Sequence, residues 1–173
     1  MRVALVFVLA AGTLAASPLA AGAATTASPA RTQITKALKQ TLKSDFVPHT
    51  AAEIDAAITP VDINGDRIPD WQVDFKDLGT AWCGTGGCRY QLWLGRAKGG
   101  PVRVFDRRVR AHERKMQNGR IVFEFDFHGT YCGETGAEAC PGIYAWSPKR
   151  GRMIALPIPG QVSAKASPID RDQ

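Results

Sequence analysis

The chain has 173 residues, four cysteines and a formal net charge of +6 at pH 7. About 150 residues remain after an N-terminal targeting segment is set aside, which is enough for one domain with a hydrophobic core. The excess positive charge is confined to one segment and the rest of the chain is about neutral, so the composition does not describe a protein that is basic throughout.

The N-terminus has the features of a secretory signal. Arg2 supplies positive charge, an apolar run extends from Val3 to about Ala16, and Ala21-Gly22-Ala23 fits an A-x-A cleavage site. The run is too short for a comfortable membrane span, although an uncleaved anchor is the alternative. We therefore predict an exported protein, periplasmic or secreted, that is not an integral membrane protein after cleavage.

The predicted organisation is a signal peptide (1–23), a flexible linker (24–31), one domain (32–156) and a flexible tail (157–173). The four-residue spacing of Ile34, Leu38 and Leu42 predicts an amphipathic helix. Thr50 and Glu53 have the spacing of a capping box, which predicts a short second helix.

Alternating apolar residues then predict β-strands as far as Leu156. The clearest strand is Ile121 to Phe127, with one apolar and one mostly polar face. The predicted fold class is α+β, with one or two N-terminal helices packed on an antiparallel sheet of five to six strands and stapled by two disulfides. The residues predicted for its core are Trp71, Val73, Leu92, Ile121, Phe123 and Phe125.

The segment VDINGDRIPDWQVDF carries the most specific chemistry. Hard oxygen ligands at alternating positions of a short loop are what a calcium ion needs. The predicted metal ligands are the side chains of Asp62, Asn64, Asp66 and Asp70, with the backbone carbonyl of Ile68. A metal-free turn, in which Asp and Asn bond their own backbone, is the alternative.

The residues DINGD and PDW resemble the calcium loop of FG-GAP and VCBS repeats, where a D-x-N-G-D-G-x-x-D loop leads into a strand. The resemblance implies calcium as a structural cofactor. It covers roughly a tenth of the chain, and no second copy is present, so a propeller is not implied. Arg67 stands where those repeats usually have Gly, in a turn that favours positive φ, and its charge opposes a cation.

The cysteines form two local pairs, Cys83 with Cys88 and Cys132 with Cys140. Three connectivities are open, and the short Gly-rich segments within each pair favour local pairing in an oxidising compartment. A zinc site and a redox-active cysteine pair are the alternatives. The spacing of Cys132 and Cys140 is too wide for the usual zinc knuckle, and neither pair has the C-x-x-C spacing of a redox motif.

The excess charge lies between residues 103 and 120. Seven basic and two acidic residues there give +5, which equals the whole excess after Arg2 is removed. Such a segment predicts a docking patch for an anionic envelope component or protein, or a solvated hairpin. Nucleic acid is disfavoured, because export removes the usual target and stacking aromatics are lacking. The residues of the predicted patch are Arg103, Arg107, Arg108, Arg110, Arg114, Lys115 and Arg120.

No familiar catalytic motif is present, so we predict a non-enzymatic binding or structural domain with one calcium loop. The alternative is a periplasmic inhibitor or docking protein that uses the CGTGGC loop or the basic hairpin. CGTGGC resembles the disulfide-closed loop of Ivy-type lysozyme inhibitors, although their loop contains a His and this one does not. The combination of DINGD, PDW and CGTGGC also resembles small uncharacterised exported proteins of proteobacteria.

Overall fold

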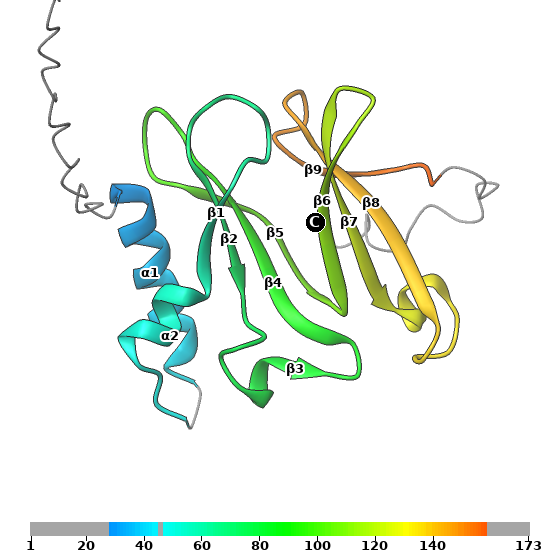
Figure 1. Cartoon of the computed structure of the whole chain (residues 1–173), viewed down its shortest axis with the longest axis horizontal. Helices are drawn as coiled ribbons and strands as arrows, with labels where there is room; N and C mark the ends of the chain where they lie inside the picture. Colours follow the sequence, from blue (N-terminus) through cyan, green and yellow to red (C-terminus); the bar gives the residue numbers. More distant parts are fainter. Residues whose placement is uncertain (1–27, 45–46, 159–173) are drawn as a thin grey trace, which may run out of the picture.

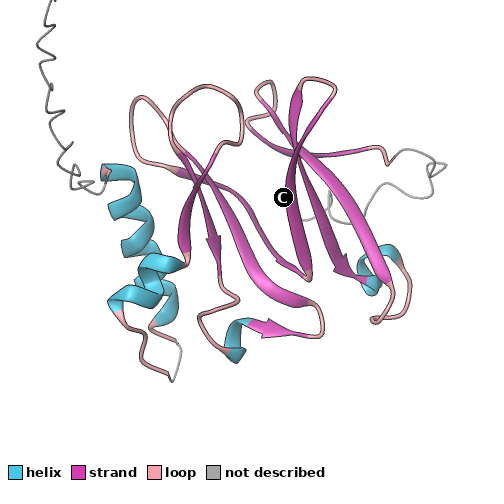
Figure 2. Cartoon of the chain, viewed as in Figure 1, coloured by secondary structure: helices cyan, strands magenta, loops and turns pink. Residues whose placement is uncertain are grey.

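The structure is a computed structural model that describes residues 28–44 and 47–158. Two antiparallel sheets pack face to face, and two helices cover the outer face of the first sheet (Figures 1 and 2). The order of the layers is therefore helices, first sheet and second sheet.

Both helices begin at the residues that cap them. Helix α1 (Pro29–Leu42) starts after Ser28, whose hydroxyl accepts from the Arg31 amide at 3.2 Å. Helix α2 (Ala51–Ala56) starts after Thr50 and has the complete predicted capping box with Glu53. The predicted stripe of α1 is confirmed, because its three apolar residues are buried against the first sheet.

The first sheet contains strands β1 (Ile58–Val61), β2 (Asp70–Asp74), β3 (Cys83–Gly84), β4 (Gly87–Leu94) and β5 (Val102–Val109). Strand β4 is central: β2 and β3 pair with it, and β5 also pairs with it along most of its length. A short 3-10 turn, η1 (Thr80–Trp82), leads into β3.

The second sheet is a meander in which each strand pairs with the next. Its strands are β6 (Ala111–Gln117), β7 (Arg120–His128), β8 (Ala139–Ser147) and β9 (Arg152–Leu156). The turn η2 (Gly129–Cys132) lies between β7 and β8.

The predicted fold class is wrong in its architecture. The described residues form two sheets of five and four strands, instead of one sheet of five or six. The chain leaves the first sheet at Arg110, the single residue between β5 and β6, whose amide donates to Asp126 O of the second sheet at 2.7 Å. Alternation identified most strands, but it carries no information about their partners, and the polar strand β6 has no alternating apolar residues to reveal it.

The main core lies between the sheets, and a second core lies under the helices. Tyr90 and Leu92 on β4 face Phe123 and Phe125 on β7, and the Phe105 and Phe125 rings stack at 4.5 Å. Trp71 and Val73 on β2 pack instead against α1. All the predicted core residues are buried except Ile121, which is half-buried.

The predicted signal peptide, residues 24–27 of the predicted linker and residues 159–173 of the predicted tail lie outside the described part of the chain. Regular structure begins at Pro29, within the predicted linker, and Ile158 of the predicted tail packs against the outer face of the second sheet. Within the described residues, no helix is long and apolar enough to cross a membrane.

Candidate functional site

The side chains of the acidic loop, residues 62–70, bond mainly to the loop itself. Asp62 Oδ1 accepts from the Gly65 amide at 2.7 Å, and Asp66 Oδ1 accepts from the Ile68 amide at 2.7 Å. Asn64 accepts from the Asp66 amide at 3.1 Å and donates to Asp66 Oδ2 at 2.7 Å. These are Asx turns, in which short polar side chains complete the hydrogen bonding of the nearby backbone.

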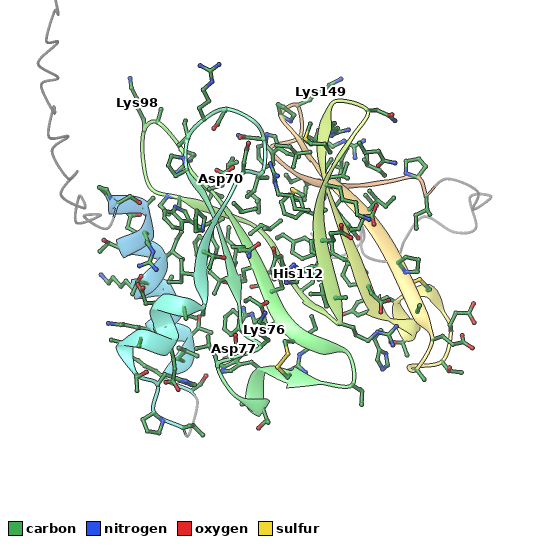
Figure 3. The ribbon with its side chains drawn as sticks, in the orientation of Figure 1. Asp70, Lys76, Asp77, Lys98, His112 and Lys149 are labelled. Atoms are coloured by element: carbon green, nitrogen blue, oxygen red, sulfur yellow. A yellow bond between two sulfur atoms is a disulfide. The ribbon has the colours of Figure 1, made fainter. Side chains whose placement is uncertain are left out.

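Asp70 ends this loop and is fully buried. Its Oδ2 accepts from the Ile63 amide at 2.9 Å, and its Oδ1 accepts from the Gly95 amide at 2.7 Å. Gly95 is needed at that position, because a Cβ there would lie 2.2 Å from Pro69 O. The carboxylate therefore ties the acidic loop to the residue that follows β4; Asp70 is labelled in Figure 3.

Burial raises the pKa of Asp70 to about 6, although the two amide hydrogen bonds act in the opposite direction. The negative charges of Asp66 and Asp62 raise the pKa further. The loop is therefore crowded with negative charge that its own hydrogen bonds compensate only in part.

The predicted calcium ligands do not form a cage of free oxygens in this arrangement. Both Asp70 oxygens hold backbone amides, and Asp62, Asn64 and Asp66 serve the Asx turns. Across residues 28–44 and 47–158, no group of three or more His, Cys, Asp or Glu side chains is placed to hold a metal ion. Calcium binding would require the loop to rearrange, and it stays a prediction.

Two arginines also bear on this loop. Arg67 has a φ of 67°, so a non-glycine residue occupies the left-handed region, which favours Gly. Arg114 reaches from β6, and its Nε donates to Asp62 O at 2.8 Å while its Nη2 lies 3.7 Å from Asp62 Oδ2. The positively charged guanidinium of Arg114 thus already lies against the acidic loop.

The predicted local disulfides are both present, Cys83–Cys88 and Cys132–Cys140, and no free cysteine is found in the described part of the chain. They lie at the end of the sheets opposite the acidic loop (Figure 1). The pairing of local cysteines is thereby confirmed.

The CGTGGC segment is a tight β3–β4 hairpin, with Cys83 opposite Cys88 and Gly84 opposite Gly87. The hairpin packs closely against the end of β5: a Cβ added to Gly87 would lie only 2.0 Å from Val109 O. It is therefore held by the first sheet along one side and does not stand free of it.

The seven residues of the predicted basic patch do not form one surface, because they belong to two sheets. Arg110 pairs with Asp126 at 3.0 Å and donates to the carbonyls of Ala137 and Glu138, so it clamps the second disulfide loop. Lys115 pairs with Glu113 and Glu124 on the second sheet, and Arg120 donates to the Trp146 carbonyl at 2.6 Å.

A smaller group of arginines does lie together on the first sheet. The β4–β5 register places Arg89 opposite Arg108, Gln91 opposite Asp106 and Trp93 opposite Arg103, so these side chains share one face. Trp93 packs beside the core under the helices, which identifies this as the helix-bearing face. We call Arg89, Arg103 and Arg108, with Trp82 and Trp93, the basic face.

Asp106 is the acidic centre of the basic face. It accepts two hydrogen bonds from Arg89 at 2.8 and 2.6 Å and one from Gln91 at 3.1 Å, and Arg103 pairs with it at 3.0 Å. The hydrogen bond to Asp106 also raises the pKa of Arg89, which stays charged. Sequence reasoning missed Arg89 and Asp106 as site residues, because the pairing of residues across two strands is not readable from either strand alone.

Histidine is the commonest general base in enzymes, and His112 and His128 both have structural partners. His112, labelled in Figure 3, lies between the sheets with its Nε2 3.2 Å from Asp74 Oδ2 and its ring 4.2 Å from the Tyr90 ring. The pKa of Asp74 is lowered: burial raises it, and the hydrogen bonds from His112 and the Lys76 amide outweigh that effect. His128 Nδ1 lies 2.8 Å from Thr130 Oγ1 at the second disulfide loop.

Two hollows differ in charge. The larger, about 440 Å³, lies on the outer face of the second sheet and is lined by three acidic residues, Glu113, Glu124 and Asp126, together with His112 and apolar residues. The smaller, about 210 Å³, lies between β5 and the β8–β9 turn and is lined by Arg103, Arg107 and Arg152 with one carboxylate, Asp106.

Comparisons with family models, with curated proteins and with solved structures gave no match. The function is therefore argued from the geometry of these residues alone.

Proposed function

We propose that this chain is an exported, non-catalytic domain that docks an anionic component of the cell envelope on its basic face. The observation that carries the proposal is the charge balance there. Asp106 is the single carboxylate beside three arginines and pairs with Arg89 and Arg103 but not with Arg108, so the face keeps a net positive charge. Positive surfaces of this kind attract and orient anionic partners.

Two of the three arginines of the basic face, Arg89 and Arg103, lie against aromatic rings. Arg103 lies 5.8 Å above the Trp93 ring, and Arg89 lies 5.4 Å from Phe75 and 5.8 Å from Trp82. A guanidinium that is already stacked loses less conformational freedom when it binds a carboxylate or phosphate. The rings therefore favour binding by reducing its entropic cost.

Export and the absence of catalysis are parts of the same proposal. Two disulfides are typical of proteins in oxidising compartments, which include the periplasm and the external medium. Binding is favoured over catalysis because His112 is occupied by Asp74 and Tyr90, and the His128–Thr130 pair lines neither hollow.

The test is the salt dependence of binding to vesicles with and without phosphatidylglycerol, using the mature oxidised protein. We expect binding only to the anionic vesicles, with affinity falling steeply as salt rises. Arg108→Glu should weaken binding by roughly tenfold or more, since it reverses an exposed charge that makes no ion pair among the described residues. Lys36→Glu, on the exposed side of α1, makes the same charge change away from the basic face and should have little effect. Equal loss in both variants, or no binding by the wild type, would contradict the proposal.

A further inference from the structure

The smaller hollow lies at the margin of the basic face and shares Arg103 with it. Its wall combines β5 with Gly151 of the β8–β9 turn and Arg152 of β9, so two sheets contribute to it. Three arginines line it, Arg103, Arg107 and Arg152, with one carboxylate residue, Asp106.

That carboxylate is engaged by other groups. Asp106 accepts from Arg89 and Gln91 and pairs with Arg103, and no ion pair joins it to Arg107 or Arg152. Among the described residues, Arg107 donates to the Asp106 backbone carbonyl at 2.9 Å and forms no ion pair, and Arg152 forms none either. Two arginines therefore line the hollow without an ion pair of their own.

We propose that this hollow binds a phosphomonoester group. Such a group carries about −1.5 to −2 charges at pH 7 and three strong acceptor oxygens, and planar guanidinium forks match those oxygens well. A volume of about 210 Å³ is several times the ~30 Å³ that one water molecule takes, so the hollow has room for the group and a few waters.

This inference rests on the proposed docking function and narrows the partner to one that bears terminal phosphate. Arg103 belongs to both the hollow and the basic face and lies over Trp93. When the phosphate group lies in the hollow, the rest of the partner molecule that bears it would lie over the basic face. Arg89 and Arg108 provide further positive charge there.

The experiment is a calorimetric titration of the mature oxidised protein with glycerol 3-phosphate and with inorganic phosphate. Wild type should bind both. Arg152→Gln and Arg107→Gln should each weaken binding at least tenfold, and Lys149→Gln, in the same β8–β9 turn, should not. Arg152→Lys keeps the charge but loses the fork, so it should recover binding only in part. Unfolding midpoints within a degree or two of wild type would show that the variants are folded.

Vesicle binding distinguishes a lipid phosphate from a soluble phosphate compound as the ligand. It also tests the docking proposal and the phosphate-site proposal separately. Phosphatidic acid carries a phosphomonoester and phosphatidylglycerol a phosphodiester, so a lipid partner predicts stronger binding to the former that Arg152→Gln abolishes. Binding of glycerol 3-phosphate without any vesicle binding would overturn docking on an envelope lipid and keep the phosphate site. Equal binding to both vesicles, unchanged in Arg152→Gln, would overturn the phosphate site and keep the basic face. No binding of either phosphate compound by wild type would also overturn the phosphate site.

Discussion

Asp70 on β2 and Asp106 on β5 lie on opposite sides of β4 in the first sheet, and the two carboxylates accept hydrogen bonds from different kinds of donor. Asp70 is fully buried and bonds two backbone amides. Asp106 is partly exposed and bonds the side chains of Arg89 and Gln91, with Arg103 beside it.

The comparison shows that a concentration of charge in the sequence does not by itself locate a binding site. The acidic loop around Asp70 has the most specific pattern, yet its polar side chains are engaged by its own backbone. The surroundings of Asp106 have no recognisable motif, yet they retain unpaired positive charge in a hollow. Capacity to bind a ligand depends on which groups remain without partners.

The largest expected effect comes from Asp70→Asn. The amide oxygen can accept from only one of the Ile63 and Gly95 amides, and the other is left buried and unsatisfied. We expect a loss of about 2–3 kcal/mol in the free energy of unfolding near pH 5, measured by urea denaturation. Asp66→Asn changes an exposed residue of the same loop and should cost less than about 1 kcal/mol. A similar loss in both variants would contradict the assignment of Asp70 as the clamp.

The effect of Asp70→Asn should also depend on pH. The pKa of Asp70 is raised from 3.8 to about 6 in the folded protein, so the folded state holds this proton more tightly than the unfolded state. Its contribution to stability is therefore full below pH 3.8 and is lost as pH rises through about 6. We expect the difference in unfolding free energy between wild type and Asp70→Asn to shrink by about 2 kcal/mol between pH 4 and pH 7. A constant difference across this range would contradict the raised pKa.

Asp106→Asn should change stability little and binding more, in contrast to Asp70→Asn. Its partners are half-exposed, so we expect a loss of only about 1 kcal/mol in stability. The variant also removes the one carboxylate of the basic face, so binding to phosphatidylglycerol vesicles should strengthen severalfold at low salt. Vesicle co-sedimentation measures this, and weaker binding would mean that Asp106 organises the arginines for the partner.

The smallest expected effect is that of calcium on the acidic loop. The sequence predicts that calcium stabilises the folded protein. The gain is limited because Asp62 and Asp66 must first break the hydrogen bonds of their Asx turns before they can bind the ion. At a free concentration equal to its dissociation constant, calcium would add only about 0.4 kcal/mol to the free energy of unfolding. Thermal melts with calcium and with a chelator, repeated on Asp66→Ala, measure it. Identical midpoints would leave the loop as a set of metal-free turns.

Local features of the fold could be predicted from the sequence, because they depend on neighbours along the chain. The capping box at Thr50, the stripe of α1 and the two local disulfides are such features. The division into two sheets could not be predicted, because it depends on one corner at Arg110 and on pairings that alternation does not encode.

The candidate site was predictable only in part for the same reason. The basic segment was visible as composition, but β5 and β6 carry its residues to different sheets. Arg152 lies some thirty residues beyond that segment and reaches the hollow only through the packing of β9 beside β5.

Both disulfides close within single local units of the chain, at sequence separations of 5 and 8 residues. Because short loops close at the smallest entropic cost, each bond can form before the two sheets have met. Oxidation of the unfolded chain should therefore give the native isomer more often than the one in three expected from random pairing of four cysteines. A chain built in this way has little need of an isomerase to correct mispaired bonds during its maturation.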